Sequence, residues 1–299
     1  MRVGRVRRGA GETLALERGE RWFDLSEAYR LHAFITEREA PPPPRGLRAL
    51  MEQGALEETA LGALVALLEK HGLWEGLALD GKLAFVLPFR PGKIIALGRN
   101  YAAHAAETGH DAPTTPVLFS KSAQACIGPD EPIRIGADYG RVDHEAELAI
   151  VIGKRARRLK EEDCRSVIAG YTLVNDVSAR DFQKDAIEKG LPWYLSKSMD
   201  TFCPLGPVVA LPSTLPWPVE VDISATVNGE VRQQSNTSRF IFSVPEVLAY
   251  ITRYITLEPG DIVSTGTPEG IGPIIPGDVV EVSVPEIGTL RNPVEAAAL

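Results

Sequence analysis

The sequence predicts an α+β protein, mainly β, in which a small N-terminal α/β domain precedes a larger domain built of strands. Two observations support this class: helical spacing of apolar residues is concentrated in the first ninety residues, and from Lys93 onward short apolar runs alternate with Gly-, Pro- and Asp-containing turns. With 299 residues, 44% of them hydrophobic and 24% charged, the chain can bury one large core or two modest ones. We expect domains at residues 1–90 and 91–299.

The composition argues against several classes of partner. Asp and Glu number 40 against 32 Lys and Arg, giving a formal net charge of −8, whereas nucleic-acid binding needs a basic face. The longest apolar run, Leu61–Leu68, is far shorter than the ~20 residues of a membrane-spanning helix. No apolar segment follows the N-terminal arginines, so no secretory signal is predicted. We therefore expect a cytoplasmic protein with no membrane or nucleic-acid partner.

The cysteines predict neither a disulfide framework nor a zinc site. The chain has three, widely separated in the sequence: Cys126, Cys164 and Cys203. An odd number without a CxxC pair is typical of buried thiols in a reducing compartment.

The first ninety residues predict a strand followed by two helices. Arginines interleave with valines over residues 2–8, which favours an edge strand with one solvated face. Apolar residues recur at helical spacing over 25–37. The run Pro41–Pro44 indicates a stiff polyproline spacer, and an Ala- and Leu-rich helix is expected over 56–71, ending at Gly72.

The larger part of the chain predicts strands joined by tight turns. Asn228-Gly229 interrupts an alternating run and indicates a hairpin. Ser243 and Glu246 have the spacing of a capping box in front of the one clear helix of this region. The apolar runs that predict the strands are 145–152, 170–175, 219–228, 262–265 and 279–284.

Three acidic residues at strand ends form a candidate metal site. Alternation along a strand places Glu145 and Glu147 on one face, where they repel one another unless a cation neutralises them. Asp176 ends another apolar strand, where a charge also needs a partner. Three carboxylates suit Mg²⁺, with Mn²⁺ or Ca²⁺ as alternatives, and leave about three octahedral positions open. The alternative is that the two glutamates simply occupy the solvated end of a strand.

His104 and Glu107 form a candidate acid–base pair. They stand three residues apart on a short Ala-rich helix, and a carboxylate beside an imidazole fixes its tautomer and raises its basicity. The alternative is an ordinary surface contact. His144 adjoins the glutamates in sequence but is expected to face away from them and to make a local hydrogen bond.

Three further segments are ambiguous when taken alone. Lys197 lies in an apolar context, which also fits a lysine whose stem packs on the surface. The Gly-rich loop 264–270 can offer amides and hydroxyls to an anion, but it lacks a nucleotide-binding motif. Residues 179–183 follow the strand that ends at Asp176, and they fit a salt-bridged turn as well as they fit a part of the site.

Together these segments resemble the fumarylacetoacetate hydrolase family over roughly residues 93–293. The resemblance is carried by the following motifs in this order: GRNYAAHAAE, VLFSKS, DHEAELAIVIG, GYTLVNDVSARDFQ, LSKSMDTFCPLGP, VNGEVRQQSNTSRFIFSV, LEPGDIVSTGTPEGIG and PGDVVEVSV. The N-terminal segment is similar to the variable domain of many bacterial members, including 2-hydroxyhepta-2,4-diene-1,7-dioate isomerase and acylpyruvase-like proteins.

The resemblance implies a mixed β-roll catalytic domain, a homodimer and a Mg²⁺ or Mn²⁺ ion held by three carboxylates. It assigns the metal ligands to Glu145, Glu147 and Asp176. It assigns catalysis to Lys197 beside the metal and to His104 with Glu107 on a lid helix. It assigns substrate binding to Gln183 and Thr267, and in matching motifs to Arg99 and Lys121.

The implied reaction is the hydrolysis of a C–C bond in a small 2-oxo or 2,4-dioxo acid, such as an acylpyruvate or fumarylpyruvate, through a metal-stabilised enolate. His104 would deprotonate the attacking water. Two alternatives from aromatic catabolism would use the same enolate without that water. They are isomerisation of 2-hydroxyhepta-2,4-diene-1,7-dioate and decarboxylation of 5-oxopent-3-ene-1,2,5-tricarboxylate or oxaloacetate. A non-catalytic protein that binds a metal carboxylate is the alternative from another class.

Overall fold

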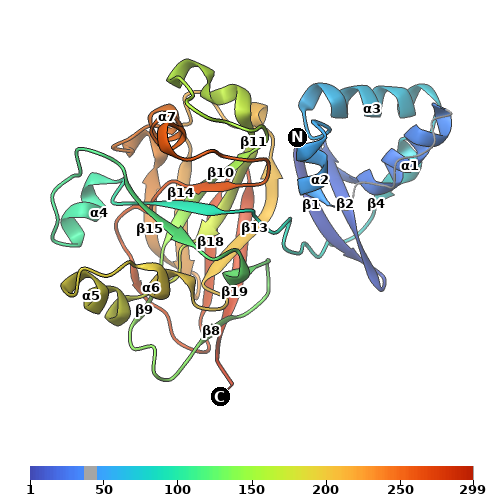
Figure 1. Cartoon of the computed structure of the whole chain (residues 1–299). Coiled ribbons are helices and arrows are strands. Elements are labelled where there is room, and N and C mark those ends of the chain that lie inside the picture. Colours follow the sequence, from blue (N-terminus) through green and yellow to red (C-terminus); the bar gives the residue numbers. More distant parts are fainter. Residues whose placement is uncertain (37–45, 299) are drawn as a thin grey trace.

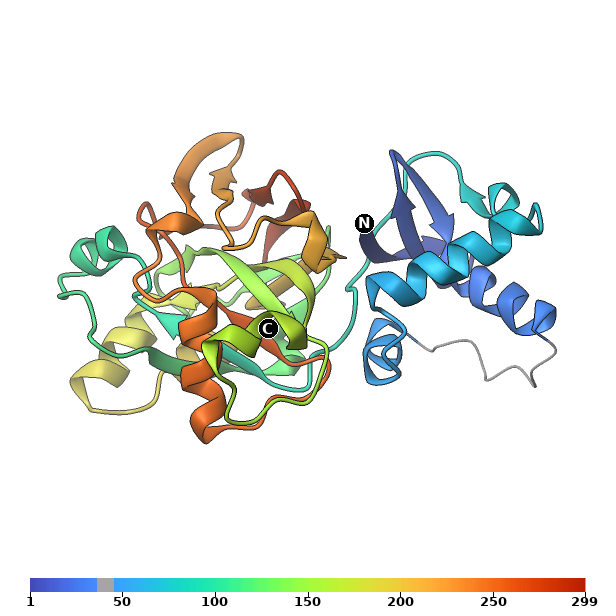
Figure 2. The ribbon, with the colours of Figure 1, turned by 90° about the horizontal axis from the view of Figure 1, so that it is seen from above.

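The computed structural model describes residues 1–36 and 46–298, so the predicted polyproline spacer at Pro41–Pro44 lies outside the described residues. Two views show a larger body, containing the C-terminal two-thirds of the chain, and a smaller N-terminal lobe beside it (Figures 1 and 2). Strands dominate the larger body and helices are few. The expected α+β, mainly β class is confirmed.

The central feature is an 11-stranded sheet that runs through both parts of the molecule. Its strand order is β4-β3-β2-β1-β13-β11-β10-β16-β5-β6, with β7 beside β13. The bounds in chain order are β1 Arg2–Arg8, β2 Gly11–Arg18, β3 Arg21–Asp24, β4 Ala78–Leu79, β5 Ile94–Gly98, β6 Val117–Lys121, β7 Cys126–Ile127, β10 Ala146–Ile152, β11 Ile168–Asn175, β13 Cys203–Ala210 and β16 Ile262–Ser264.

Two smaller sheets complete the larger body. One has the order β15-β14-β18-β19-β8 and the other β12-β9-β17. Asn228 and Gly229 both have positive φ and join β14 to β15, so the predicted hairpin is confirmed. The bounds are β8 Ile133–Ile135, β9 Val142–His144, β12 Ser178–Ala179, β14 Asp222–Val227, β15 Glu230–Asn236, β17 Gly272–Pro273, β18 Val279–Val284 and β19 Gly288–Ala296.

The expectation that the first strand is an edge strand was wrong. Arg2–Gly4 of β1 pair with β13, while the other side of β1 pairs with β2. The arginines are nevertheless half-buried or exposed, as a solvated face requires, and Arg2 is paired with Glu17 and Arg5 with Glu12. The N-terminal strands therefore continue the central sheet, and the division of the chain at residue 90 stays a prediction.

The helices were predicted in part. The expected helices near 25–37 and 56–71 are present, and so is the helix after Ser243, whose N–H donates to Glu246 Oε2 at 2.7 Å. Three helices had no distinct sequence signal: α2, α5 and α6. In the described residues the α-helices are α1 Leu25–Ile35, α2 Leu47–Glu52, α3 Glu58–Lys70, α4 Ala102–Glu107, α5 Arg180–Glu188, α6 Tyr194–Ser198 and α7 Val244–Tyr254.

The buried strand β10 separates two cores. Successive side chains of β10 point to opposite faces. Leu148 and Ile150 lie in the core shared with α7 and the five-stranded sheet, whereas Ala149 and Val151 lie in the core shared with the N-terminal lobe. Every residue of β10 is buried. The start of β10 is therefore held rigidly from both faces, which matters because the acidic residues lie there.

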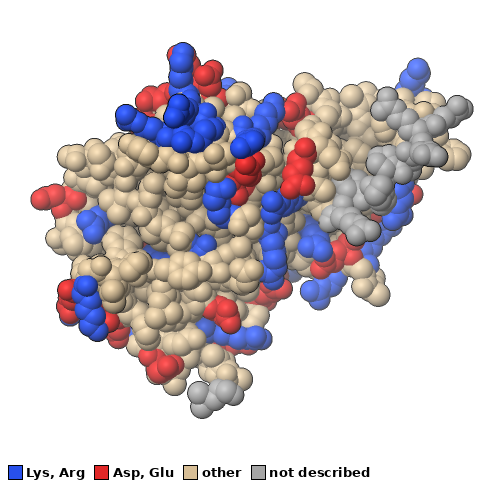
Figure 3. Space-filling model, viewed as in Figure 1, with Lys and Arg blue, Asp and Glu red and all other residues tan. Residues whose placement is uncertain are grey.

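The basic run 154–160 is arranged around the end of α7. Figure 3 shows Lys and Arg side chains gathered at the top of the molecule with acidic side chains beside them. Arg157 donates to the carbonyl of Thr252 at 2.7 Å, and Arg155 pairs with Glu258.

Among the described residues, none of the helices combines the length and apolar character needed to cross a membrane.

Gly170 on β11 provides a test of how closely the two central strands approach. A Cβ atom at Gly170 would lie 2.3 Å from the carbonyl oxygen of Ala210 on β13. We expect Gly170→Ala to lower the free energy of unfolding by about 1–3 kcal/mol, because the backbone must shift to relieve the overlap. Urea unfolding measures the effect.

Gly62 on α3 is the matched control, because it is exposed and a Cβ there would meet no atom within 4 Å. We expect Gly62→Ala to raise the free energy of unfolding by about 0.5–1 kcal/mol, since alanine is the better helix former. Wild-type stability in Gly170→Ala would contradict the close pairing of β11 with β13.

Candidate active site

The three acidic residues are brought together by the pairing of two strands. Glu145 lies between β9 and β10, Glu147 lies on β10, and Asp176 directly follows β11. The N–H of Asp176 donates to the carbonyl of Glu145 at 2.8 Å, and the N–H of Glu145 donates to Asn175 Oδ1 at 3.0 Å. These bonds lock the start of β10 against the end of β11.

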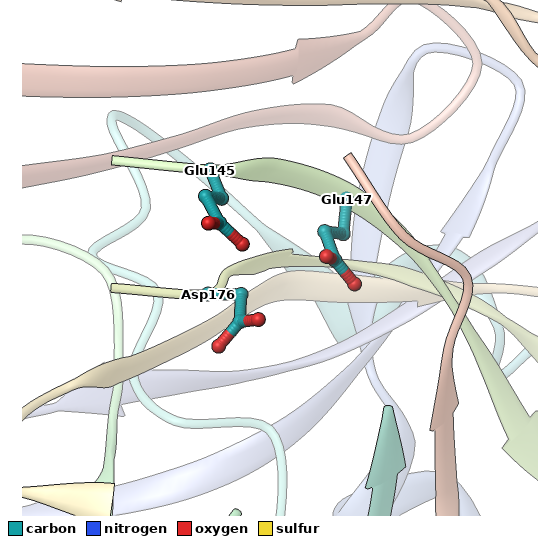
Figure 4. Close-up of side chains that lie close together, drawn as sticks. All are labelled: Glu145, Glu147 and Asp176. Carbon is teal, nitrogen blue, oxygen red and sulfur yellow. The ribbon is translucent and has the colours of Figure 1, made fainter. Parts of the chain in front are cut away.

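The three carboxylates face a common space (Figure 4). One oxygen from each lies within 4.8 Å of the others, and the residues are 3%, 1% and 0% exposed for Glu145, Glu147 and Asp176. The alternative interpretation, a solvated strand end carrying two glutamates, was therefore wrong. Burial of three negative charges this close together requires compensating positive charge.

Two buried lysines supply part of that charge. Lys197 on α6 donates to Glu145 Oε2 at 2.9 Å and to Asp176 Oδ2 at 2.7 Å. Lys121 at the end of β6 donates to Asp176 Oδ1 at 2.6 Å. Both lysines are almost fully buried, so Lys197 is not a surface lysine. Lys121 does not line the cavity described below, and its contacts hold Asp176 in place from behind.

An arginine network that the sequence interpretation missed supplies the rest. Arg180, at the start of α5, is ion-paired with Glu145 and donates its Nε to Asp143 Oδ2 at 2.8 Å. Asp143 is fully buried and also accepts from Arg141 at 2.8 and 3.0 Å. Asp143 stands two residues before Glu145, so strand alternation could have indicated a third carboxylate on that face.

The charges around the two glutamates shift their pKa values in opposite directions. Burial raises the pKa of Glu145, but the nearby charges of Lys197 and Arg180 outweigh it and hold that pKa well below its usual range. For Glu147, burial and the negative charges of Asp176 and Glu145 act together, and they hold its pKa well above the usual range. Glu145 is therefore ionised at neutral pH, and Glu147 is the glutamate of this pair that holds a proton more strongly when no cation is present.

Glu147 is bound by the Gly-rich loop that follows β16. Its Oε2 accepts from Ser264 Oγ at 2.5 Å and from the N–H of Gly266 at 3.0 Å. Gly266 has φ +89°, and a Cβ there would lie 2.9 Å from the Cβ of Asn100, so only glycine fits. The amides of this loop thus bind carboxylates of the protein itself: the N–H of Gly266 binds Glu147, and the N–H of Gly270 binds Glu107.

His104 and Glu107 on α4 are oriented toward the same region. Nδ1 of His104 lies 3.3 Å from Glu107 Oε2, and Glu107 Oε1 accepts from the N–H of Gly270 at 3.0 Å. His104 is buried, with 7% of its surface exposed. Glu107 is therefore held both by His104 and by the Gly-rich loop.

A cavity of about 610 Å³ lies over the carboxylates. This volume is typical of a small-molecule site. Arg99 lies 5.8 Å from the Trp193 ring in a cation–π contact. Of the ten site residues predicted from the sequence, eight line this cavity, whereas Asp176 and Lys121 do not. The eight are Arg99, His104, Glu107, Glu145, Glu147, Gln183, Lys197 and Thr267.

The donor set fits a hard divalent cation. Carboxylate oxygens are the ligands preferred by Mg²⁺, Mn²⁺ and Ca²⁺. The hydrogen bonds of Glu147 among the described residues all fall on Oε2 and leave Oε1 free as a ligand. Glu145, Glu147 and Asp176 could together hold one ion at the base of the cavity.

The raised pKa of Glu147 predicts that cation binding releases a proton. Because a cation requires the ionised carboxylate, we expect Mn²⁺ binding to release protons over the pH range in which Glu147 titrates, and we expect affinity to rise with pH through that range. Titration calorimetry in buffers of different ionisation enthalpy counts the protons.

The variant Glu147→Gln should weaken Mn²⁺ binding and abolish the proton release. Glu20→Gln, which changes an exposed carboxyl of the N-terminal lobe in the same way, should leave both quantities unchanged. Mn²⁺ binding to the wild type with no proton release and no change of affinity with pH would contradict the raised pKa of Glu147.

The comparisons with known proteins agree with this geometry. The family described as fumarylacetoacetate (FAA) hydrolase C-terminal matches residues 93–295. The mitochondrial oxaloacetate tautomerase of Xenopus laevis is 38% identical over 262 residues, which are 85% of this chain and 80% of that protein.

Two solved structures are similar over the whole chain. The 2-hydroxyhepta-2,4-diene-1,7-dioate isomerase from Mycobacterium marinum has a TM-score of 0.74 at 30% identity and covers 100% of both chains. The maleylpyruvate hydrolase from Sphingobium sp. SYK-6, solved with manganese(II) ion and pyruvate, has a TM-score of 0.76 at 29% identity and also covers 100% of both chains. The carboxylate cluster, the mainly β fold and these similarities agree, and the chain belongs to the fumarylacetoacetate hydrolase family.

Proposed function

We propose that this protein is a divalent-metal-dependent enzyme that acts on a 2-oxo or 2,4-dioxo acid through an enolate, and that it hydrolyses the C–C bond of an acylpyruvate. The observation that carries this proposal is the convergence of two devices on one cavity. Glu145 and Glu147 of the carboxylate cluster line this cavity, with Asp176 beside them, and the His104–Glu107 pair lines it as well. The first suits enolate chemistry and the second suits activation of water.

The charges of the cavity favour an anionic substrate. Burial lowers the pKa of Lys197, but the negative charges of Asp176 and Glu145 raise it by more, so the net shift is upward and Lys197 stays protonated. Arg99 and Arg180 also line the cavity. These cations would attract the carboxylate of a 2-oxo acid and place its reactive carbon chain beside His104. Lys197 would stabilise negative charge as it develops on the acid's oxygens.

His104 would act as the base that activates water. Glu107 faces Nδ1 and would keep the proton on that nitrogen, so Nε2 is left to accept a proton from water. The hydroxide formed would attack the distal carbonyl, and the C–C bond would break to give a carboxylic acid and the enolate of pyruvate. The proton taken by His104 would balance the one that the enolate carbon needs to become pyruvate.

A divalent cation held by Glu145, Glu147 and Asp176 would polarise neighbouring oxygens of the acid and lower the energy of an enolate. We propose Mg²⁺ or Mn²⁺, and the maleylpyruvate hydrolase solved with manganese(II) supports the choice of Mn²⁺. A homodimer is part of the same proposal and rests on family membership.

Keto–enol interconversion of oxaloacetate is the second candidate. It is supported by the tautomerase relative, which is more similar to this chain than the maleylpyruvate hydrolase is. Such a reaction moves a proton on the same enolate and needs no attacking water. The variant His104→Ala therefore separates the two candidates.

We expect His104→Ala to lower acylpyruvate hydrolysis by about 10²–10⁴-fold, because general base catalysis is lost. The exposed His71 of the N-terminal lobe is the matched control, and His71→Ala should have wild-type activity. The measurement is an ultraviolet assay of chelator-stripped protein with Mg²⁺ or Mn²⁺ restored, using acetylpyruvate, fumarylpyruvate, oxaloacetate and 2-hydroxyhepta-2,4-dienedioate with product identification.

Undiminished hydrolysis in His104→Ala would contradict the role of His104 as base. Metal-dependent loss of the oxaloacetate enol without cleavage of any acylpyruvate would favour the second candidate. An absorbance shift of the dienedioate alone, or release of carbon dioxide alone, would assign the protein to isomerisation or decarboxylation.

A further inference from the structure

Gln233 on β15 connects three segments that border the site. It is buried, with 1% of its surface exposed. Its Oε1 accepts from the N–H of Ala146 at 2.9 Å and lies 3.2 Å from Nδ1 of His144. Its Nε2 donates to Thr267 Oγ1 and to the carbonyl of Pro268, each at 2.8 Å. One side chain thus joins the start of β10 to the Gly-rich loop.

The orientation of this amide is fixed by its backbone partners. The N–H of Ala146 can only donate, so the atom facing it must be the oxygen of Gln233. The carbonyl of Pro268 can only accept, so the atom facing it must be the nitrogen. Two independent backbone groups therefore require the same orientation. His144 then donates from Nδ1 to Gln233, which is 89 residues away, so the hydrogen bond is not the local one expected from the sequence.

The orientation of Gln233 decides what Thr267 can do. Because Nε2 of Gln233 is a donor, the hydroxyl oxygen of Thr267 must accept from it. Among the described residues the Thr267 hydroxyl donates to no acceptor, and Thr267 lines the cavity. Its proton is therefore available to a ligand in the cavity.

Gln183 is polarised in the same way. Its Oε1 accepts from Arg180 Nη1 at 2.8 Å, and a guanidinium can only donate. The amide nitrogen of Gln183 is left to donate, and this residue also lines the cavity. Two neutral side chains that could either donate or accept are thus both held as donors.

We propose that Gln233 is a positioning residue that makes Thr267 an obligatory hydrogen-bond donor, so that this wall of the cavity selects acceptor oxygens such as those of a carboxylate or an enolate. The inference deepens the proposed function and rests on it for the choice of ligand class. A ligand that offers a hydroxyl proton at this position meets a second proton and binds less well.

Oxalate is a suitable probe because it presents only acceptor oxygens and is not turned over. Its affinity for the Mn²⁺-loaded full-length protein is measured by titration calorimetry. We expect Thr267→Val to weaken oxalate binding about tenfold, the loss of one hydrogen bond to a charged group, and Thr267→Ser to stay within about twofold of wild type because it keeps the donor. Equal losses in the two variants would overturn the assignment of Thr267 as donor.

The role of Gln233 is tested by removing its donor. In Gln233→Glu both side-chain oxygens accept, so the Thr267 hydroxyl turns its proton toward the new carboxylate and away from the cavity. We expect the roughly tenfold difference between Ser and Val at position 267 to fall to about onefold in this background. A difference that stays tenfold would overturn the positioning role.

Gln234→Glu is the matched control, because the neighbouring glutamine carries the same change on the exposed face of β15. It should leave oxalate affinity and the Ser-to-Val difference unchanged. If Gln233→Glu fails to fold, Gln233→Met removes the same donor without adding an acceptor or a charge, so the Thr267 hydroxyl can either donate or accept. Oxalate should then keep its affinity, whereas glycolate, which offers a hydroxyl proton, should bind more tightly than it does to the wild type, and unchanged glycolate affinity would overturn the positioning role. Mn²⁺ affinity and thermal unfolding are measured for each variant. Failure of the proposed function would instead appear as wild-type protein that binds oxalate but turns over no 2-oxo acid.

Discussion

The repulsion among three buried carboxylates is the constraint on which the rest of the site depends. Isolated negative charges are not stable in a protein interior, so the fold has to bring cations to the same place. Lys121, Lys197 and Arg180 come from β6, α6 and α5, three elements that are distant in sequence from β10. The ends of β6, α5 and α6 are therefore positioned by electrostatic demand as well as by apolar packing.

A single loop links this charged cluster to the acid–base pair. Residues 264–270 supply the hydroxyl and amide that bind Glu147 and the amide that binds Glu107. Gly270 has φ +92°, and a Cβ there would lie 2.1 Å from the carbonyl oxygen of Arg232, so the loop passes directly against β15. This close passage is what allows Gln233 to reach Thr267. The glycines of the loop thus serve close approach rather than phosphate binding.

Residues whose role follows from local pattern could be predicted from the sequence, whereas residues defined by a distant partner could not. Strand alternation placed Glu145 and Glu147 on one face, and helical spacing paired His104 with Glu107. Arg180 looked like part of an ordinary turn because its partner Glu145 is 35 residues away. Gln233 lies in a plain alternating hairpin, and its partner Thr267 is 34 residues away. The pairing of β1 with β13 was missed for the same reason, since a strand carries no local signal of its second neighbour.

The two chemical devices of the cavity differ in how they are held, and this bears on the variety of reactions in the family. The two glutamates stand at the start of β10 and Asp176 follows its neighbour β11. Strand β10 is buried on both faces and paired on both edges. His104 and Glu107 stand on a six-residue helix, and Glu107 is tied to the rest of the cavity by one hydrogen bond to Gly270. In the proposed function, enolate chemistry would therefore depend on the rigid sheet, while water activation would depend on a small appended segment. A change in that segment would then add or remove the hydrolytic step without disturbing the sheet. This separation gives a physical reason why a tautomerase, an isomerase and a hydrolase can all resemble one chain.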